Sequence, residues 1–163
     1  TGSTGPRGEI GPTGPTGPAI GATASLASRT AQIFNAPNYG SVFFDMTGAL
    51  HGISLSANRK YVIVETAGLY LINYGVRATI GTPGLCTIAF TPGGIDNAAK
   101  IPLVAGTIVS GSIVRRMGAQ TRVFLWIDSA DNNTTISLPA TSAYANAYFT
   151  VCYIGPYPQD VPI

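Results

Sequence analysis

Short apolar segments alternate with turn residues along most of the chain, from residue 29 onward. Clusters of Gly, Pro, Asn and Asp separate the segments, and no stretch repeats apolar residues at helical spacing. Strands at such short intervals predict an all-β fold, either a sandwich or a barrel. About ten strands are expected, at residues 31–34, 41–44, 53–55, 61–65, 69–79, 85–91, 107–115, 121–127, 134–138 and 147–154.

Three of the expected strands are apolar at consecutive positions: 61–64, 123–127 and 149–154. A strand with one face in water alternates apolar with polar residues, so these segments are predicted to be covered on both faces. One face would pack in the core of the domain and the other against a second surface. We infer that this second surface belongs to sister copies of the same chain.

The first stretch of the chain follows a different pattern, with a period of three residues. Three polyproline-like chains wind so closely in collagen that only glycine fits at every third position. The pattern predicts a collagen triple helix and therefore a homotrimer, and a flexible Gly/Pro linker is the alternative. The glycines expected on the axis are Gly2, Gly5, Gly8, Gly11, Gly14 and Gly17.

The third position of these triplets never holds proline. Such a helix gains nothing from proline hydroxylation, which favours a bacterial or viral collagen-like protein over an animal one. Thr4, Thr13 and Thr16 occupy this position and would point outward. They are candidate O-glycosylation sites, and plain solvent-facing threonines are the alternative.

Composition divides the chain into four parts. Residues 1–19 form the collagen-like segment, and the small, polar residues 20–28 are expected to be a junction. Residues 29–155 form the β domain, and the proline-rich residues 156–163 an extended tail. The sequence has neither an initiator Met nor a signal peptide, so we expect a C-terminal fragment of a longer chain.

Charge and hydropathy narrow the class of partner. Hydrophobic residues make up 45% of the chain and charged residues 10%, against about a quarter charged in ordinary domains. We infer that neighbouring copies cover part of the surface. The net charge of +2 is too small to indicate nucleic-acid binding, and no apolar run is long enough to predict a transmembrane span.

Catalytic residues are not apparent in the sequence. The one histidine, His51, stands in a turn-like context and is expected to be an exposed loop residue without a triad. The acids are scattered, and no phosphate-binding glycine loop is present. We expect neither an enzyme nor a cofactor. Cys86 and Cys152 match no metal motif; two buried thiols are favoured over a disulfide.

Two polar loops, 96–100 and 128–133, are candidate ligand sites. Acidic and amide oxygens in the second loop could bind calcium, but plain Asx turns are the favoured interpretation. The loop residues singled out are Asp96, Lys100, Asp128 and Asp131. A hairpin of strands 107–115 and 121–127 would also place Arg115, Arg116 and Arg122 side by side, as a solvated rim or a site for an acidic partner.

Aromatic residues are concentrated in the later strands. Aromatic side chains dominate both cores and protein interfaces, so we assign these residues to the core and the threefold interface without separating the two roles. A carbohydrate platform is the alternative. The residues are Tyr70, Tyr74, Phe124, Trp126, Phe149 and Tyr153.

Residues 68–74 read Gly-Leu-Tyr-Leu-Ile-Asn-Tyr and resemble the Gly-x-Tyr-x-Phe-x-aromatic strand of the C1q/tumour-necrosis-factor jelly roll, with Ile in place of Phe. Residues 109–114 followed by 118–126 are similar to that family's late strand pair, and residues 147–154 to its closing strand. The resemblance covers about residues 25–154. It implies a homotrimeric jelly-roll sandwich of antiparallel strands.

The Gly-Pro-Thr triplets joined to such a domain resemble the collagen-like glycoproteins of the bacterial spore exosporium, of the Bacillus type. This resemblance implies a structural protein of the spore surface, whose globular trimer nucleates and terminates a collagen-like stalk. Its expected partners are its own copies, other exosporium proteins, or a host receptor or glycan. The alternatives are an adhesion or glycan-binding module and a phage or viral collagen-like fibre tip.

Overall fold

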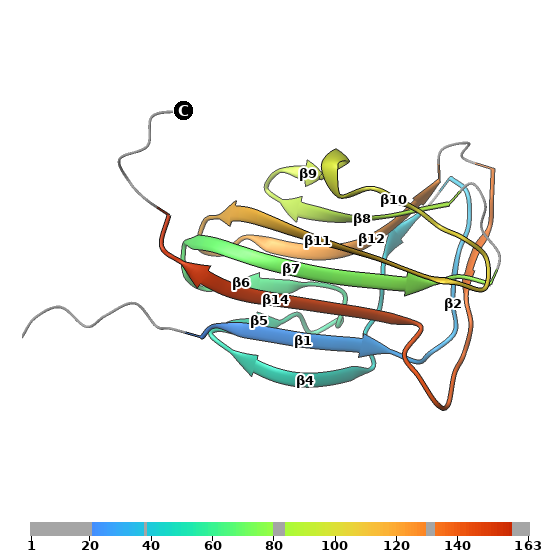
Figure 1. Cartoon of the computed structure of the whole chain (residues 1–163), viewed down its shortest axis with the longest axis horizontal. Coiled ribbons are helices and arrows are strands. Elements are labelled where there is room, and N and C mark those ends of the chain that lie inside the picture. Colours follow the sequence, from blue (N-terminus) through green and yellow to red (C-terminus); the bar gives the residue numbers. More distant parts are fainter. Residues whose placement is uncertain (1–20, 38, 80–83, 130–132, 158–163) are drawn as a thin grey trace, which may run out of the picture.

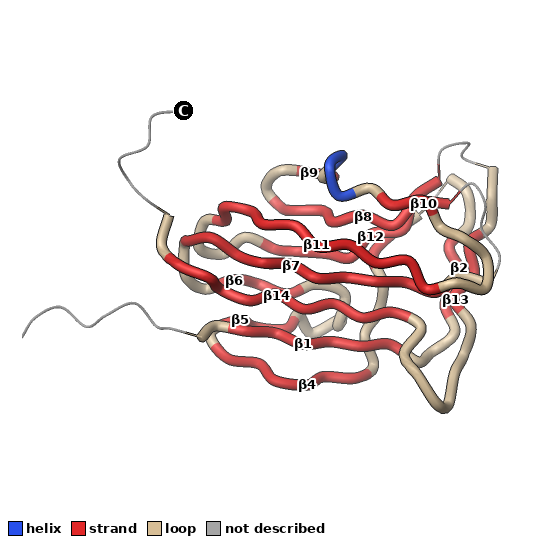
Figure 2. The backbone as a smooth tube through the Cα atoms, in the orientation of Figure 1, coloured by secondary structure: helices blue, strands red, loops and turns tan. Residues whose placement is uncertain are grey.

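The computed structural model describes residues 21–37, 39–79, 84–129 and 133–157. Within them the chain is almost entirely β-structure, as predicted, and η1 (Asn97–Ala99) is the one helical element (Figure 2). The strands are β1 (Thr23–Ser28), β2 (Gln32–Phe34), β3 (Gly40–Ser41), β4 (Met46–His51), β5 (Ile53–Leu55), β6 (Val62–Val64), β7 (Gly68–Arg77), β8 (Gly84–Thr91), β9 (Gly94–Ile95), β10 (Ile101–Pro102), β11 (Ile108–Met117), β12 (Arg122–Ser129), β13 (Ile136–Leu138) and β14 (Ala147–Gly155).

Two antiparallel sheets pack face to face as a sandwich (Figure 1). The five-stranded sheet has the order β11-β7-β14-β1-β4. The other sheet has the order β10-β8-β12-β6-β5, with β3 added beside β12 and β9 beside β8. A separate pair, β2 and β13, buries Phe34, Ile136 and Leu138 near one end of the sandwich.

Alternating burial explains why the long strands form a sandwich. In β7, Tyr70, Ile72 and Tyr74 are buried in the core, while Leu71 and Asn73 lie on the opposite face. β12 repeats this pattern with Val123, Leu125 and Ile127 inward. Fully burying one such side chain contributes about 1.5–3 kcal/mol, so the shared core holds the two sheets together.

The expected junction at 20–28 is wrong from Thr23 onward, because Thr23–Ser28 form the interior strand β1, between β14 and β4 of the five-stranded sheet. Ala24 and Leu26 face the core, whereas Thr23 and Ser25 face outward. Small side chains gave this segment little hydrophobic contrast, so its alternation was not apparent. Pairing with β14 on one side and β4 on the other determines its strand conformation.

Three other strands were not predicted. β4 is an edge strand whose six residues are all exposed, so it has no burial pattern to detect. Its last residue, His51, is exposed as expected but lies on a strand rather than in a loop. β9 and β10 are two-residue strands that pair with β8, and both lie between the expected strands 85–91 and 107–115.

The expected hairpin of arginine-bearing strands does not form. β11 pairs with β7 in the five-stranded sheet, whereas β12 pairs with β8 in the other sheet. The short connection between them crosses from one sheet to the other, with Gln120 at a φ of 66° and Thr121 N–H donating to the Gly118 carbonyl. Arg115 and Arg122 therefore belong to different layers.

Candidate functional site

The outer face of the five-stranded sheet is poor in charge. One row across it consists of Ser25, Thr150, Asn73 and Ser112, which are register partners on β1, β14, β7 and β11. All four side chains are polar and uncharged. The row therefore offers hydrogen-bonding groups without the large desolvation penalty that accompanies the burial of ions.

The rows on either side of this polar row are mixed apolar and small. One contains Thr23, Cys152, Leu71 and Val114, and the other contains Ala27, Tyr148, Gly75 and Ser110. On the described residues of β1, β7, β11 and β14, the charged side chains of this face are Arg77 and Arg116, which lie toward the ends of their strands. The middle of the face carries no charge.

The outer face of the other sheet is aromatic. Tyr61 and Phe124 have ring centroids 4.8 Å apart, and Arg122 lies over the Tyr61 ring at 5.4 Å. Trp126 lies two residues along β12, beside a hollow of about 200 Å³ that Ile95 also lines. Aromatic rings that combine an apolar body with partial exposure are typical of recognition surfaces.

The structure separates the six aromatics singled out in the sequence. Tyr70, Tyr74 and Phe149 are buried in the core. Tyr153 packs edge-on against Tyr70 at 5.3 Å between centroids and is half-buried. Phe124 and Trp126, on the outer face of the second sheet, have no core role; whether any of the six lies in a threefold interface stays a prediction.

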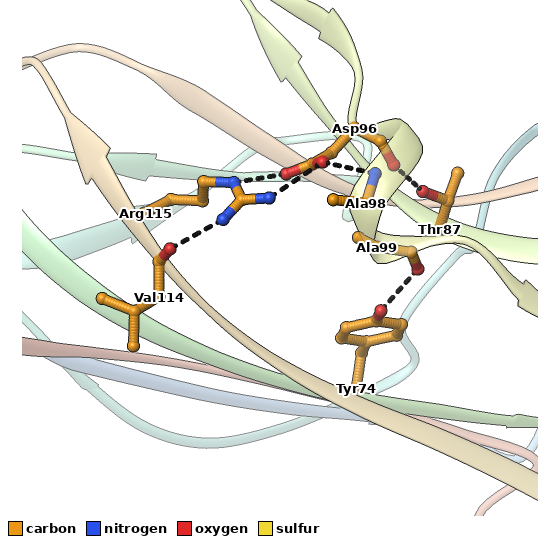
Figure 3. Close-up of polar contacts among 7 residues, drawn as sticks. All are labelled: Tyr74, Thr87, Asp96, Ala98, Ala99, Val114 and Arg115. Atoms are coloured by element: carbon orange, nitrogen blue, oxygen red, sulfur yellow. Dashed lines mark hydrogen bonds and ion pairs between the residues drawn. The ribbon is translucent and has the colours of Figure 1, made fainter.

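The segment after β9 forms an ion pair with the edge strand β11 (Figure 3). Arg115 Nε donates to Asp96 Oδ2 at 2.5 Å, and Arg115 Nη2 donates to Asp96 Oδ1 at 3.0 Å. Asp96 Oδ1 also accepts from the Ala98 N–H, which caps the start of η1. A bidentate arginine–carboxylate pair of this kind has a defined geometry.

Two further hydrogen bonds fasten this segment to β7 and β8 (Figure 3). The Thr87 hydroxyl donates to the Asp96 carbonyl at 2.7 Å, and the buried Tyr74 hydroxyl donates to the Ala99 carbonyl at 2.5 Å. Arg115 Nη1 donates to the Val114 carbonyl at 2.9 Å. The ion pair is therefore supported by a hydrogen-bonded frame of neighbouring strands.

Electrostatics agree with this geometry. The hydrogen bond from Arg115 lowers the pKa of Asp96, and the same bond raises the pKa of Arg115. Burial raises the pKa of Tyr74 to about 12, so its hydroxyl remains a donor at neutral pH. The pair stays ionised over the whole neutral range.

A groove of about 520 Å³ opens beside this frame, between the β8–β9 hairpin and the end of β11. Phe90, Ile95 and Met117 supply apolar surface, and Asp96, Arg115 and Arg116 line it with charge. The guanidinium of Arg116 lies over the Tyr157 ring at 4.0 Å. The groove combines an apolar floor with a cationic rim.

The predicted ligand loops have separate outcomes. Asp96 is engaged by Arg115, Lys100 is exposed, and Asp128 accepts from the Ser129 N–H. Asp131 lies outside the described residues, as do the collagen-like glycines and Thr4, Thr13 and Thr16. Across the described part of the chain, His, Cys, Asp and Glu side chains nowhere gather in a group of three or more suited to a metal ion.

The two cysteines differ in environment. Both are free thiols. Cys86 is fully buried and burial raises the pKa of its thiol, as the prediction of buried thiols requires. Cys152 departs from that prediction because it lies half-buried on the outer face of the five-stranded sheet, with Sγ 3.4 Å from Thr23 Oγ1. Alternation along β14 turns it away from the core.

The Asp96 frame, which we define as the Asp96–Arg115 ion pair with the hydrogen bonds from Thr87 and Tyr74, was only partly apparent in the sequence. Residue 96 was noted as a loop acid, but its partner Arg115 lies 19 residues later and was assigned to a rim. An Asp before Asn-Ala-Ala is a recognisable N-cap signal, which would have predicted η1.

The part of the chain that the structure describes contains no helix with the length and hydropathy of a membrane span.

Similarity to known proteins lies in the fold. No family model matches the sequence, and no curated protein matches it either. The globular domain of a zebrafish complement 1qA protein superposes with a TM-score of 0.57 at 12% identity, covering 83% of this chain and 99% of that one. Eiger TNF from S. frugiperda gives 0.58 at 10% identity, covering 88% and 99%. The expected C1q/TNF-like jelly roll is confirmed.

Proposed function

We propose that the chain is a structural protein whose jelly-roll domain forms a homotrimeric cap on a collagen-like stalk. One observation carries the proposal: the strict glycine register of residues 2–17 leads, after a few residues, into β1, and β1 lies in the sheet with the charge-poor outer face. The cap acts by assembly and not by catalysis.

The position of β1 supports a specific arrangement. The chain enters the five-stranded sheet at Thr23, and the Ala22 carbonyl accepts from the Tyr153 N–H at that end. In the proposed trimer, three copies turn the outer face of this sheet toward a common axis. Their three N-terminal segments then leave the domain near that axis, which is where a triple helix needs them.

The chemistry of this face supports close packing. Its central row of Ser25, Asn73, Ser112 and Thr150 has no ion that must lose water on burial. Leu71 and Val114 add apolar area. A standard protein interface buries about 1,600 Å² in total, and a sheet of this size has room for one of that order.

A trimeric domain would also solve the folding problem of the stalk. Six glycine triplets order many backbone torsions with little apolar burial. Once the caps have associated, the three stalk strands are held at high effective concentration and in register. The cap would therefore nucleate the triple helix at its C-terminal end and terminate it there.

We place this assembly on the outside of a bacterial spore, as part of an exosporium filament. The Gly-Pro-Thr triplets and the 10% charged content support this assignment, which extends the resemblance to spore collagen-like glycoproteins. Thr4, Thr13 and Thr16 would carry O-linked sugar. Other exosporium proteins would anchor the stalk.

The first experiment measures the solution mass of residues 21–163 by light scattering over a dilution series. The buried core lies within these residues, so the fragment retains it. A trimer that persists on dilution supports assembly by the β domain. A monomer at every concentration would contradict the proposal.

A variant pair tests the face. Ser112→Glu adds one negative charge per chain, so three like charges would meet around the proposed axis. The variant should therefore convert trimer to monomer. Thr91→Glu is the matched control, because it places a carboxylate on an exposed residue of the other sheet. Equal effects of the two changes, or none from Ser112→Glu, would exclude this face as the interface.

A second function, recognition at the filament tip, is favoured by the aromatic outer face of the other sheet. In the proposed trimer Phe124 and Trp126 remain uncovered beside the small hollow at Ile95, which differs from the sequence-based expectation that sister copies cover strand 123–127. We propose a glycan or receptor as the ligand of this face. A glycan screen on the trimer, repeated with Trp126→Ser, tests it; an unchanged profile would contradict the assignment.

A further inference from the structure

The groove beside the β8–β9 hairpin lies at the β11 edge of the sandwich, where Arg116, near the end of the proposed interface face, is one of its lining residues. Its volume of about 520 Å³ lies within the range of about 300–1,000 Å³ that is usual for small-molecule sites. Met117 is almost fully buried and Phe90 is partly buried against the core. The apolar floor of the groove is therefore continuous with the hydrophobic core at the edge of the sandwich. Ile95, by contrast, is 39% exposed and available to a ligand.

Arg115 presents unused hydrogen-bond donors at this groove. A guanidinium has five N–H donors, and the bonds to Asp96 and Val114 use three of them. The side chain is 35% exposed. Because Asp96 fixes the orientation of the guanidinium, a ligand that binds the remaining donors does not have to order a flexible side chain.

The charge of the groove selects for an anion. Asp96 is the one acid that lines it among the described residues, and both of its carboxylate oxygens already accept from Arg115. The two charges of this pair offset each other. Arg116, held over the Tyr157 ring, then leaves the rim with one net positive charge.

The wall that carries Asp96 is a fixed one. Thr87 binds the backbone at Asp96, just before η1, and Tyr74 binds it at Ala99, the last residue of η1. The hydrogen bond from Arg115 lowers the pKa of Asp96. The groove is therefore shaped before a ligand arrives. A preformed site with apolar walls and a few fixed polar groups is the usual form of a small-molecule site.

We propose that this groove binds a small organic monocarboxylate with an apolar body, such as an aromatic acid. The carboxylate accepts from the remaining N–H groups of Arg115 and from Arg116, a geometry that guanidinium groups favour. The apolar body covers Ile95 and Phe90. This site goes beyond the structural role proposed above, and every residue that lines the groove belongs to one chain.

The test titrates the full chain with 2-naphthoate and follows binding by calorimetry, with 2-naphthamide as the uncharged match. We expect saturable binding of one naphthoate per chain, weakening as salt is raised, and about tenfold weaker binding of the amide. Absence of saturation with naphthoate up to several millimolar, or equal affinity for acid and amide, would overturn the proposal.

Two arginine variants locate the site. Arg116→Gln should weaken naphthoate binding about five- to tenfold. Arg122→Gln is the matched control, because Arg122 is also an exposed arginine over a tyrosine ring but does not line this groove. An equal loss in both variants would mean that naphthoate binds by general charge attraction, which contradicts a built site.

A third variant tests the apolar floor. Ile95→Ser removes exposed apolar surface without opening the core and should weaken binding several-fold. A chain ending at Tyr157 tests a rival occupant, the segment 158–163 with its acid Asp160. If naphthoate bound the shortened chain but not the full one, the chain's own tail would be the ligand and the proposal would be wrong.

Discussion

Tyr74 and Gly111 are register partners on β7 and β11, and the tyrosine ring occupies the space where a side chain of residue 111 would stand. A Cβ at Gly111 would lie 2.6 Å from the ring Cζ and 2.5 Å from Ile101 Cδ1. The ring cannot move away freely, because it is buried and its hydroxyl donates to the Ala99 carbonyl. Gly111 is therefore a packing requirement of the Asp96 frame.

Gly111→Ala should lower the free energy of unfolding by about 1–3 kcal/mol, the usual cost of overpacking. Gly40→Ala is the matched control, since a Cβ there would meet nothing within 4 Å. Urea unfolding of both variants measures the difference. Equal stability of the two variants would show that the Tyr74 ring yields more easily than its contacts indicate.

Tyr74→Phe should cost about 1–2 kcal/mol at neutral pH, because the buried Ala99 carbonyl loses its donor. The pKa of Tyr74 is raised from 10.0 to about 12. A raised pKa stabilises the folded state below pH 10, and that contribution is lost as the pH rises toward 12. The stability of the variant should therefore fall less steeply than the wild type between pH 10 and 12.

Chemical unfolding of both proteins across this pH range measures the slopes. Tyr70, whose pKa burial also raises, remains in both proteins and contributes equally to them. Parallel slopes would mean that Tyr74 does not titrate in this window.

Asp96→Asn should lower stability by about 1 kcal/mol near pH 7 by weakening the pair with Arg115. The pKa of Asp96 is lowered from 3.8, so its stabilisation is present above that value and lost as the pH falls through the lowered pKa. The gap between wild type and variant should close in acid. Asp128→Asn is the control, because Asp128 accepts a local hydrogen bond from the neighbouring Ser129 N–H. A gap that stayed constant to pH 2 would refute the assignment.

Thiol labelling reports on the proposed interface. Cys86 should react only on unfolding, since it is buried. Cys152 lies on the outer face of the five-stranded sheet beside Leu71, so assembly should protect it and the Ser112→Glu variant should expose it. Rates measured with a maleimide, and assigned with Cys152→Ala, test this. Rapid labelling of Cys152 in a stable trimer would place the interface elsewhere.

Gly11→Ala separates the stalk from the cap. A side chain on the axis should weaken the triple helix while the β domain stays trimeric, because its core and outer faces are unchanged. Circular dichroism of the collagen-like segment and light scattering of the whole chain measure the two parts. A cap that dissociated in this variant would show that the stalk, and not the β domain, drives assembly.

Local patterns in the sequence were sufficient to predict the fold class. Apolar residues bounded by turn residues indicated the strands β7 and β12, but which face of each lies inside was not predicted, because β12 is apolar on both faces and the aromatic residues of both strands could serve the core or an interface. Gly and Pro located the turns for the same local reason. The period of three at residues 2–17 is likewise a property of the chain alone.

Strands without hydrophobic contrast could not be found in this way. β1 is built from small residues and β4 is exposed throughout, so only their pairing partners determine their conformation. The partner of a strand is a property of the whole sheet. For this reason the sequence did not show that β11 and β12 lie in different sheets, and a hairpin between them was expected instead.

The sequence by itself determined an all-β domain behind a collagen-like segment, because periodicity and turn chemistry are local. Only the tertiary structure decided that Tyr74 is core while Trp126 faces outward, and that Asp96 pairs with Arg115. These outcomes depend on which strands meet and which faces they turn toward each other. The hydrophobic pattern of one strand does not specify which strand it pairs with. Contacts between residues far apart in the chain are therefore decided only when the strands pack together.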